Sequence, residues 1–205
     1  TVFRAYVHPV DQDRISPQSF FNLNVYRLQG FHPTYIESQN EWKSQATELL
    51  DRLAWEREFI RLAHLADYKV AGFCFPTGNP EQQDWFVLRD AGFCGADAIA
   101  IHEYWGKQGF TGWNALRYLK VHNWLNGHHP PFIITECGRD ALEGCDRRPG
   151  WILQDVSVDE YIEELIAYNA EISKDSYVLG ATPFTLATTT NWQNFGIDSI
   201  VDKLA

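Results

Sequence analysis

The sequence contains no methionine, and it has fewer basic than acidic residues. Its 205 residues include 17 Lys and Arg against 27 Asp and Glu, so the formal net charge is -10. A charge of this sign repels phosphate backbones and anionic lipid surfaces, and no cluster of Lys and Arg offsets it. The composition therefore argues against nucleic acid and membrane as partners, and it leaves the oligomeric state open.

Long apolar segments and targeting signals are missing as well. No apolar run approaches the roughly 20 residues needed to span a bilayer, and the first residues do not resemble a signal peptide. Secretion and a cytoplasmic location both stay open. A chain of 205 residues, 45% of them apolar, is long enough to bury one core and too short for two. A single domain over residues 1–205 is therefore expected.

Motifs for metals and nucleotide cofactors are lacking. None of the cysteines has the CxxC spacing of a zinc site, and no glycine-rich phosphate loop follows a strand. His128 and His129 stand side by side, but no carboxylate lies at ligand spacing from them. Cys137 and Cys145 allow either a short disulfide or two free buried thiols. The sequence predicts neither a metal nor a cofactor.

What the chain does contain is a regular alternation of strands and helices. Short runs of β-branched and aromatic residues alternate with longer amphipathic segments, which is typical of βα units and a parallel sheet. Six strands are predicted, at residues 2–7, 34–38, 69–75, 96–101, 132–135 and 178–184. Such a chain forms either an open doubly wound sheet or part of an eight-stranded barrel, and the missing phosphate loop favours the barrel.

The clearest helix signal lies between the last two strands. Ser157 and Glu160 form a capping box ahead of apolar residues at helical spacing, which predicts a helix that begins at Val158. Two more helices are expected before the third and fifth strands. The first is marked by Leu49, Leu50, Leu53 and Ile60, and the second by Trp113, Leu116, Lys120 and Trp124.

Two glutamates occupy informative places in this pattern. Glu41 and Glu136 each stand where an apolar run gives way to a polar loop. In a (β/α)8 barrel the functional residues lie where strands end, so both acids are expected to face one cleft. Other polar or aromatic residues at predicted strand ends are His102, Glu103, Tyr104, Asn191 and Trp192. Because side chains alternate along a strand, His102 and Tyr104 share one face and Glu103 takes the other.

At this level of detail the chain resembles clan A of the retaining glycoside hydrolases. Residues 35–41, with the sequence YIESQNE, resemble the end of barrel strand four, where that clan carries an Asn-Glu motif. Residues 132–138, with the sequence FIITECG, resemble the end of strand seven, which carries the second glutamate. The interval of about 95 residues between the two motifs is close to three βα units of roughly 30 residues each.

The resemblance implies a fold and a set of roles. The fold would be an α/β, TIM-type (β/α)8 barrel from which the first two βα units are absent. Glu136 would be the nucleophile and Glu41 the general acid/base in the cleavage of a β-linked oligo- or polysaccharide, with no cofactor. The implied substrate-binding residues are Asn40, His102, Tyr104 and Trp192, with Trp192 as a platform for the sugar and Tyr104 as a hydrogen-bond donor to Glu136.

The sequence departs from the pattern of the clan in two respects. Trp42 follows Glu41 where the clan often has proline. Because strands one and two are absent, the arginine that the clan places on strand two is absent with them, and Arg4 is the nearest substitute. Glu37 is either a second inward acid or an ion-pair partner, so it has no assigned role.

Three alternatives stay open at the level of sequence. Glu103 and Glu136, on neighbouring strands, could be the catalytic pair in place of Glu41 and Glu136. The chain could bind carbohydrate without turning it over. It could also be a barrel fragment with exposed strand edges and no function of its own.

Overall fold

The computed structural model describes residues 1–7, 9–12, 14–41, 46–141, 149–186 and 192–204. Within them lies one sheet of six parallel strands whose spatial order follows the chain. The strands are β1 (Val2–Phe3), β2 (Tyr35–Glu37), β3 (Lys69–Phe75), β4 (Ala98–Trp105), β5 (Phe132–Arg139) and β6 (Val178–Pro183). The six predicted strands are confirmed, and the curled sheet has the architecture of a partial TIM-type barrel.

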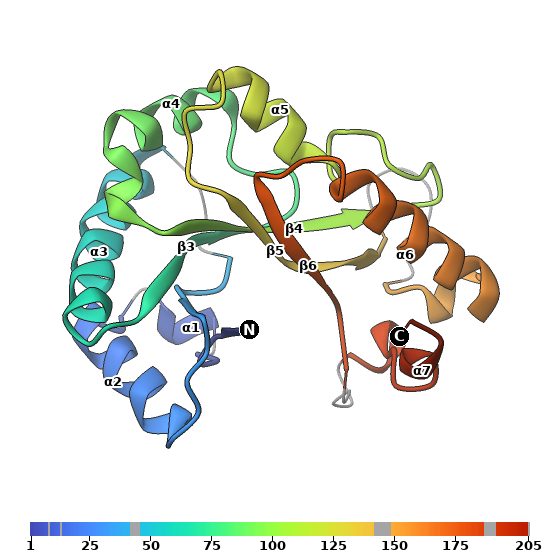
Figure 1. Cartoon of the computed structure of the whole chain (residues 1–205), viewed down its shortest axis with the longest axis horizontal. Coiled ribbons are helices and arrows are strands. Elements are labelled where there is room, and N and C mark those ends of the chain that lie inside the picture. The colour runs from blue at the N-terminus through green and yellow to red at the C-terminus, as the bar shows by residue number, and fades with distance from the viewer. Residues whose placement is uncertain (8, 13, 42–45, 142–148, 187–191, 205) are drawn as a thin grey trace.

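Helices follow one another in an arc around this sheet (Figure 1). The longer helices are α2 (Pro17–Leu28), α3 (Ala46–Leu65), α4 (Gln82–Asp90), α5 (Arg117–Trp124) and α6 (Val158–Ile172). Short helices are α1 (Pro9–Gln12) and α7 (Val201–Leu204), with single 3-10 turns at Gly92–Gly95, Ile152–Gln154 and Gln193–Phe195. Among the described residues, no helix is both long and apolar enough to cross a membrane.

The three predicted helices are present as α3, α5 and α6, whereas α2 and α4 were not predicted and not every boundary is correct. Helix α6 begins at Val158, and both hydrogen bonds of the Ser157 and Glu160 capping box are present. Helix α5 begins at Arg117, so Trp113 and Leu116, which were expected to mark this helix, precede its first residue. The reason is tertiary, because the carboxylate of Glu103 accepts the backbone N–H groups at the start of α5 and fixes that start from outside the helix.

Strand boundaries differ from prediction in two ways. Strand β1 ends at Phe3, and the N–H of Ala5 instead donates to the side chain of Asn24 in α2 at 3.0 Å. Strands β4 and β5 are longer than predicted. His102 and Glu136 therefore lie inside strands and not in the loops that follow them, and the two residues pair with each other in the ladder between β4 and β5.

The two faces of the sheet have different residues. The helix-facing side carries large apolar residues such as Ile99, Ile101 and Phe132, which are fully or almost fully buried. The opposite side, called the inner face below, carries mostly small residues: Ala71, Cys74, Ala98, Ala100 and Ile133. Small side chains on the inner face leave room for polar side chains to meet near the carboxyl ends of the strands, which is the end where (β/α)8 barrels carry their active sites.

Two irregularities in the ladder decide which residues reach the inner face. On β3 the register shifts between Gly72 and Phe75, so that Phe73 stays on the helix side and Cys74 turns inward. On β5 the register skips Thr135, which pairs Glu136 with His102. An extra residue of this kind re-aims the side chains that follow it. Without it, strict alternation from Ile133 would turn Glu136 towards the helices.

Candidate active site

The polar centre of the inner face is an ion pair between Arg4 and Glu136. Nη2 of Arg4 donates to Oε1 of Glu136 at 2.7 Å, and only 12% of the Glu136 side chain is exposed. Arg4 follows β1 in the chain, at the far edge of the sheet from β6. Arg4 thus supplies a cation to Glu136 of β5. From the sequence, Arg4 was only the nearest substitute for the arginine that the clan places on strand two.

Arg4 also contacts the residues beside it on the inner face. Its Nη1 lies 3.4 Å from Oε2 of Glu37 and 3.1 Å from Sγ of Cys74. Burial lowers the pKa of Arg4, but Glu37, Cys74 and Glu136 together raise it above its ordinary value, so the guanidinium stays charged. Glu37 is therefore an ion-pair partner of Arg4, which settles the open question about its side chain.

Tyr104 supports Glu136 from the other side. Its hydroxyl donates to Oε2 of Glu136 at 2.8 Å, which is the hydrogen bond expected from the sequence. Burial, followed by the charge of Glu136, raises the pKa of the phenol, so Tyr104 keeps its proton and stays a donor. With one oxygen bound by Arg4 and the other by Tyr104, the Glu136 carboxylate is fixed in orientation.

Glu41 reaches the same centre from the loop after β2. Its Oε1 lies 2.8 Å from Nδ1 of His102, and the Glu41 side chain is 42% exposed. Burial raises the pKa of Glu41, but the hydrogen bond to His102 and the charges of His102 and Arg4 outweigh it and hold the pKa below the ordinary value. Burial lowers the pKa of His102, while Cys74, Glu136 and Glu41 raise it well above its ordinary value.

The two carboxylates lie close to each other. One oxygen each of Glu41 and Glu136, together with a ring nitrogen of His102, lie within 4.8 Å of one another. Nδ1 of His102 lies 3.4 Å from Oε2 of Glu136, so the imidazole stands between the two acids. The site therefore combines an enclosed carboxylate, that of Glu136, with a more exposed one, that of Glu41.

Two buried residues of α3 hold the loop that carries Glu41. Nη2 of Arg52 donates to the carbonyls of Gln39 and Phe73, at 3.2 and 3.1 Å. Glu56 pairs with Arg52 at 2.5 Å and accepts the N–H of Phe73. The N–H of Glu41 donates to the carbonyl of Cys74. Arg52 and Glu56 thus tie the end of β2 to the irregular end of β3.

Glu103 lies on the opposite side of the sheet from these groups. It is fully buried and accepts hydrogen bonds from the N–H groups of Leu116 and Tyr118 and from the hydroxyl of Tyr168. The structure therefore does not bring Glu103 to Glu136, and the alternative catalytic pair is wrong on geometry. Trp105, on the same side, donates to Glu164 of α6.

Other candidate residues lie around the centre or outside the described chain. Asn40 stands next to it, with Oδ1 3.6 Å from Sγ of Cys74. Trp192 is 49% exposed and packs edge-on against Phe184, which in turn packs edge-on against Tyr104. Residues outside the described part of the chain include Trp42, Cys145 and Asn191. Cys137 is a free, buried thiol.

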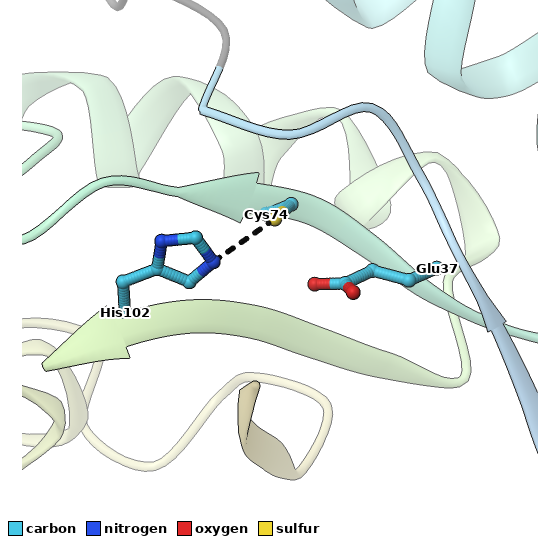
Figure 2. A group of neighbouring side chains, drawn as sticks. All are labelled: Glu37, Cys74 and His102. Carbon is cyan, nitrogen blue, oxygen red and sulfur yellow. Dashed lines mark hydrogen bonds between the residues drawn. The ribbon is translucent and has the colours of Figure 1, made fainter. Parts of the chain in front are cut away.

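Two groups of side chains on the inner face have the chemistry of metal ligands. One is Glu41, His102 and Glu136, and the other is Glu37, Cys74 and His102, shown in Figure 2. Sequence reasoning looked for ligands close together in the chain and missed both, because each member comes from a different strand or loop. Their shared histidine links them to the same centre.

Comparison with protein-family models and with curated protein sequences finds no match. Solved structures do match. A variant of a GH128 (subgroup I) endo-β-1,3-glucanase from Amycolatopsis mediterranei, in complex with laminaritriose and laminaribiose, has a TM-score of 0.58 at 14% identity over 89% of this chain. A β-glucuronidase from Bifidobacterium dentium has a TM-score of 0.59 at 18% identity over 96% of this chain.

These likenesses show the fold. The chain spans 73% of that glucanase chain and 33% of that glucuronidase chain. A second endo-β-1,3-glucanase, the GH128 (subgroup IV) enzyme from Lentinula edodes, has a TM-score of 0.51 at 19% identity. The half-barrel of parallel strands is thus a fold that this chain has in common with glycoside hydrolases.

Proposed function

We propose that this chain is a retaining glycoside hydrolase that cleaves β-linked glycans with Glu136 as nucleophile and Glu41 as general acid/base. The observation that carries the proposal is that one carboxylate oxygen of Glu41 and one of Glu136 lie within 4.8 Å of each other. A separation of about 5 Å is typical of retaining enzymes, whereas inverting enzymes hold their carboxyl groups roughly 6.5–9.5 Å apart to admit a water.

Glu136 is suited to attack the anomeric carbon. Its carboxylate is enclosed and held by hydrogen bonds from Arg4 and Tyr104. These donors hold the carboxylate in a fixed orientation for attack, and they stabilise it again when the glycosyl-enzyme bond is hydrolysed and the carboxylate is released.

Glu41 is suited to transfer the proton. Its exposed carboxyl can reach the leaving oxygen of a sugar that enters from solvent. In the site without substrate, the hydrogen bond and the charge of His102 lower the pKa of Glu41. A bound sugar that parts Glu41 from His102 and excludes water favours the protonated acid, which then protonates the leaving group.

The substrate is proposed to be a β-linked glucan, with β-1,3-glucan as the first to test because the GH128 matches are endo-β-1,3-glucanases. Asn40, His102 and Tyr104 line the reacting centre on the sides nearest the two acids. Trp192 is placed beyond Phe184, where its exposed indole can stack on a sugar ring.

The test is chemical rescue of the nucleophile. Glu136→Ala should lose hydrolysis of an activated aryl β-glucoside while keeping its fold. Azide should then restore turnover and yield the glycosyl azide of inverted configuration. Glu163→Ala, at an exposed position of α6, is the matched control and should keep full activity. Full hydrolysis by folded Glu136→Ala would contradict the assignment.

A carbohydrate-binding protein without turnover is the second candidate, because the chain spans only part of the enzymes that it resembles. Both candidates bind glycan, so affinity does not separate them. Product release from β-1,3-glucan does: the enzyme releases reducing sugar, and the binding protein releases none.

A further inference from the structure

The inner face holds a second constellation next to the two acids. Glu37 of β2, Cys74 of β3 and His102 of β4 point their ligand atoms towards one another (Figure 2), and these atoms lie within 4.8 Å of each other. All three residues are buried. A thiol, an imidazole and a carboxylate are the side chains that Zn²⁺ and related borderline-soft cations prefer.

The distances are close to those of a tetrahedral site. Zinc bonds of about 2.0–2.3 Å place neighbouring ligand atoms roughly 3.3–3.8 Å apart. Sγ of Cys74 lies 3.3 Å from Nε2 of His102, so this pair already has the separation of two zinc ligands. Oδ1 of Asn40, 3.6 Å from the same sulfur, is in reach as a fourth ligand. A fourth position taken by water is equally compatible with the geometry.

The guanidinium of Arg4 contacts all three of these side chains. Nη1 of Arg4 lies 3.1 Å from Sγ of Cys74, 3.5 Å from Nε2 of His102 and 3.4 Å from Oε2 of Glu37. The same side chain holds Glu136 through its other amino group. A metal ion that takes the three ligands must therefore displace Nη1 of Arg4 and disturb the support of Glu136.

The carboxylate of Glu37 has capacity for another partner. Its Oε1 is buried, and within the described residues it receives no hydrogen bond. An acceptor buried without a partner costs free energy that a bound cation would recover.

We propose that Glu37, Cys74 and His102 form a binding site for Zn²⁺ and other borderline-soft divalent cations, in competition with the guanidinium of Arg4. The ion binds Cys74 as the thiolate, and the thiol proton is released to solvent. Binding moves Arg4 away from Glu136. Where Glu136 is the nucleophile, Zn²⁺ is thereby an inhibitor of the reaction, and this consequence rests on the proposed function.

Titration with Cd²⁺ tests the site without any measurement of activity. A cadmium thiolate absorbs in the ultraviolet by charge transfer, so the reduced chain should give a saturable band that Zn²⁺ competes away. Cys74→Ser should lose the band. Cys94→Ser, which removes a thiol of the helix side, is the matched control and should keep it. A band that survives in Cys74→Ser would overturn the proposal.

Arg4→Ala tests whether the metal ion competes with the guanidinium of Arg4 for the three ligands. Removal of the resident cation should lower the apparent Kd for Cd²⁺ by about tenfold or more, because two cations no longer compete for the same ligands. Equal or weaker binding would contradict the competition. Far-ultraviolet circular dichroism checks the fold of each variant. Zn²⁺ should also raise the Tm of the wild-type chain and leave that of Cys74→Ser unchanged.

The two proposals can fail separately. If the chain shows no hydrolysis but the cadmium band depends on Cys74, the metal site stands without the enzyme. If Cd²⁺ binds with no charge-transfer band, the Glu41, His102 and Glu136 group is the ligand set, and the site proposed here is wrong.

Discussion

Nη2 of Arg4 and Oε1 of Glu136 lie 2.7 Å apart, although 132 residues separate the two in the chain. This contact joins the first strand region of the sheet to the strand that carries the proposed nucleophile. It brings a permanent cation to a carboxylate that is only 12% exposed, and it connects Glu136 through Arg4 to Glu37 and Cys74.

Replacement of Arg4 should affect both activity and stability. Arg4→Ala is expected to lower kcat/KM by about 100-fold, since it removes a fixed positive charge from the reacting centre. It should also lower the free energy of unfolding by about 3 kcal/mol, because Glu136 and Glu37 lose their buried partner. Steady-state kinetics and urea unfolding measure the two effects. Arg61→Ala, an exposed residue of α3, should change neither. Unaltered kinetics in folded Arg4→Ala would refute the role.

Tyr104→Phe isolates one hydrogen bond. The ring contacts with Phe184 and Phe195 are kept, and only the hydroxyl bound to Glu136 is lost. We expect kcat to fall roughly 10- to 100-fold, the equivalent of a hydrogen bond to a charged group. Tyr118→Phe removes a hydroxyl that binds Asp175 on the helix side, and it should leave kcat as it is. Equal effects of both variants would point to general destabilisation.

Glu103 should govern stability and its pH dependence, and not catalysis. Burial raises its pKa to about 7, against the hydrogen bonds from Tyr168, Tyr118 and Leu116, which lower it. Between pH 4.5 and 7 the folded protein retains a proton at Glu103 that the unfolded chain has released, so this contribution to stability is lost as the pH rises through that window. The free energy of unfolding should fall by about 3 kcal/mol across this pH range.

Urea unfolding of the wild type and Glu103→Gln across this pH range measures the difference. The variant lacks the titrating group. The difference in free energy of unfolding between wild type and variant should therefore change between pH 4.5 and 7, while the variant still hydrolyses substrate. If folded Glu103→Gln were inactive, the case for Glu41 as the partner of Glu136 would fail.

Trp192→Ala should weaken substrate binding. Its indole is 49% exposed and touches the reacting centre only through Phe184 and Tyr104. Loss of a stacking surface should raise KM about tenfold with a small change in kcat, because the contact is similar in the ground and transition states. Tyr26→Ala, on the exposed side of α2, should leave KM unchanged. A fall in kcat with KM constant would exclude a platform role.

Much of the fold was accessible from the sequence because it is encoded locally. The capping box of Ser157 and Glu160 marks the start of α6, and runs of β-branched residues mark the strands. Helix α2 was missed although Ser16 and Pro17 are a start signal, with Ser16 accepting the N–H of Ser19. Polar residues interrupt its apolar face. One of them, Asn24, is buried and accepts a hydrogen bond from the N–H of Ala5.

The site was less accessible, because it depends on register. Alternation from Ile133 would send Glu136 to the helix side, and only the irregularity at Thr135 turns it inward. The inward turn of Cys74 depends in the same way on the register shift in β3. The partnership of Arg4 with Glu136 depends on strand order across the whole sheet, for which no local pattern exists.

Covalent trapping tests the central claim most directly. A fluorinated β-glucoside whose glycosyl-enzyme hydrolyses slowly should add the mass of one glycosyl group to the chain, and peptide mapping should place it on Glu136. The account predicts that Glu41→Gln slows this labelling unless the leaving group is a good one, while Glu136→Gln abolishes it. Labelling of any other residue, or active turnover with no trapped intermediate, would contradict a retaining mechanism with Glu136 as its nucleophile.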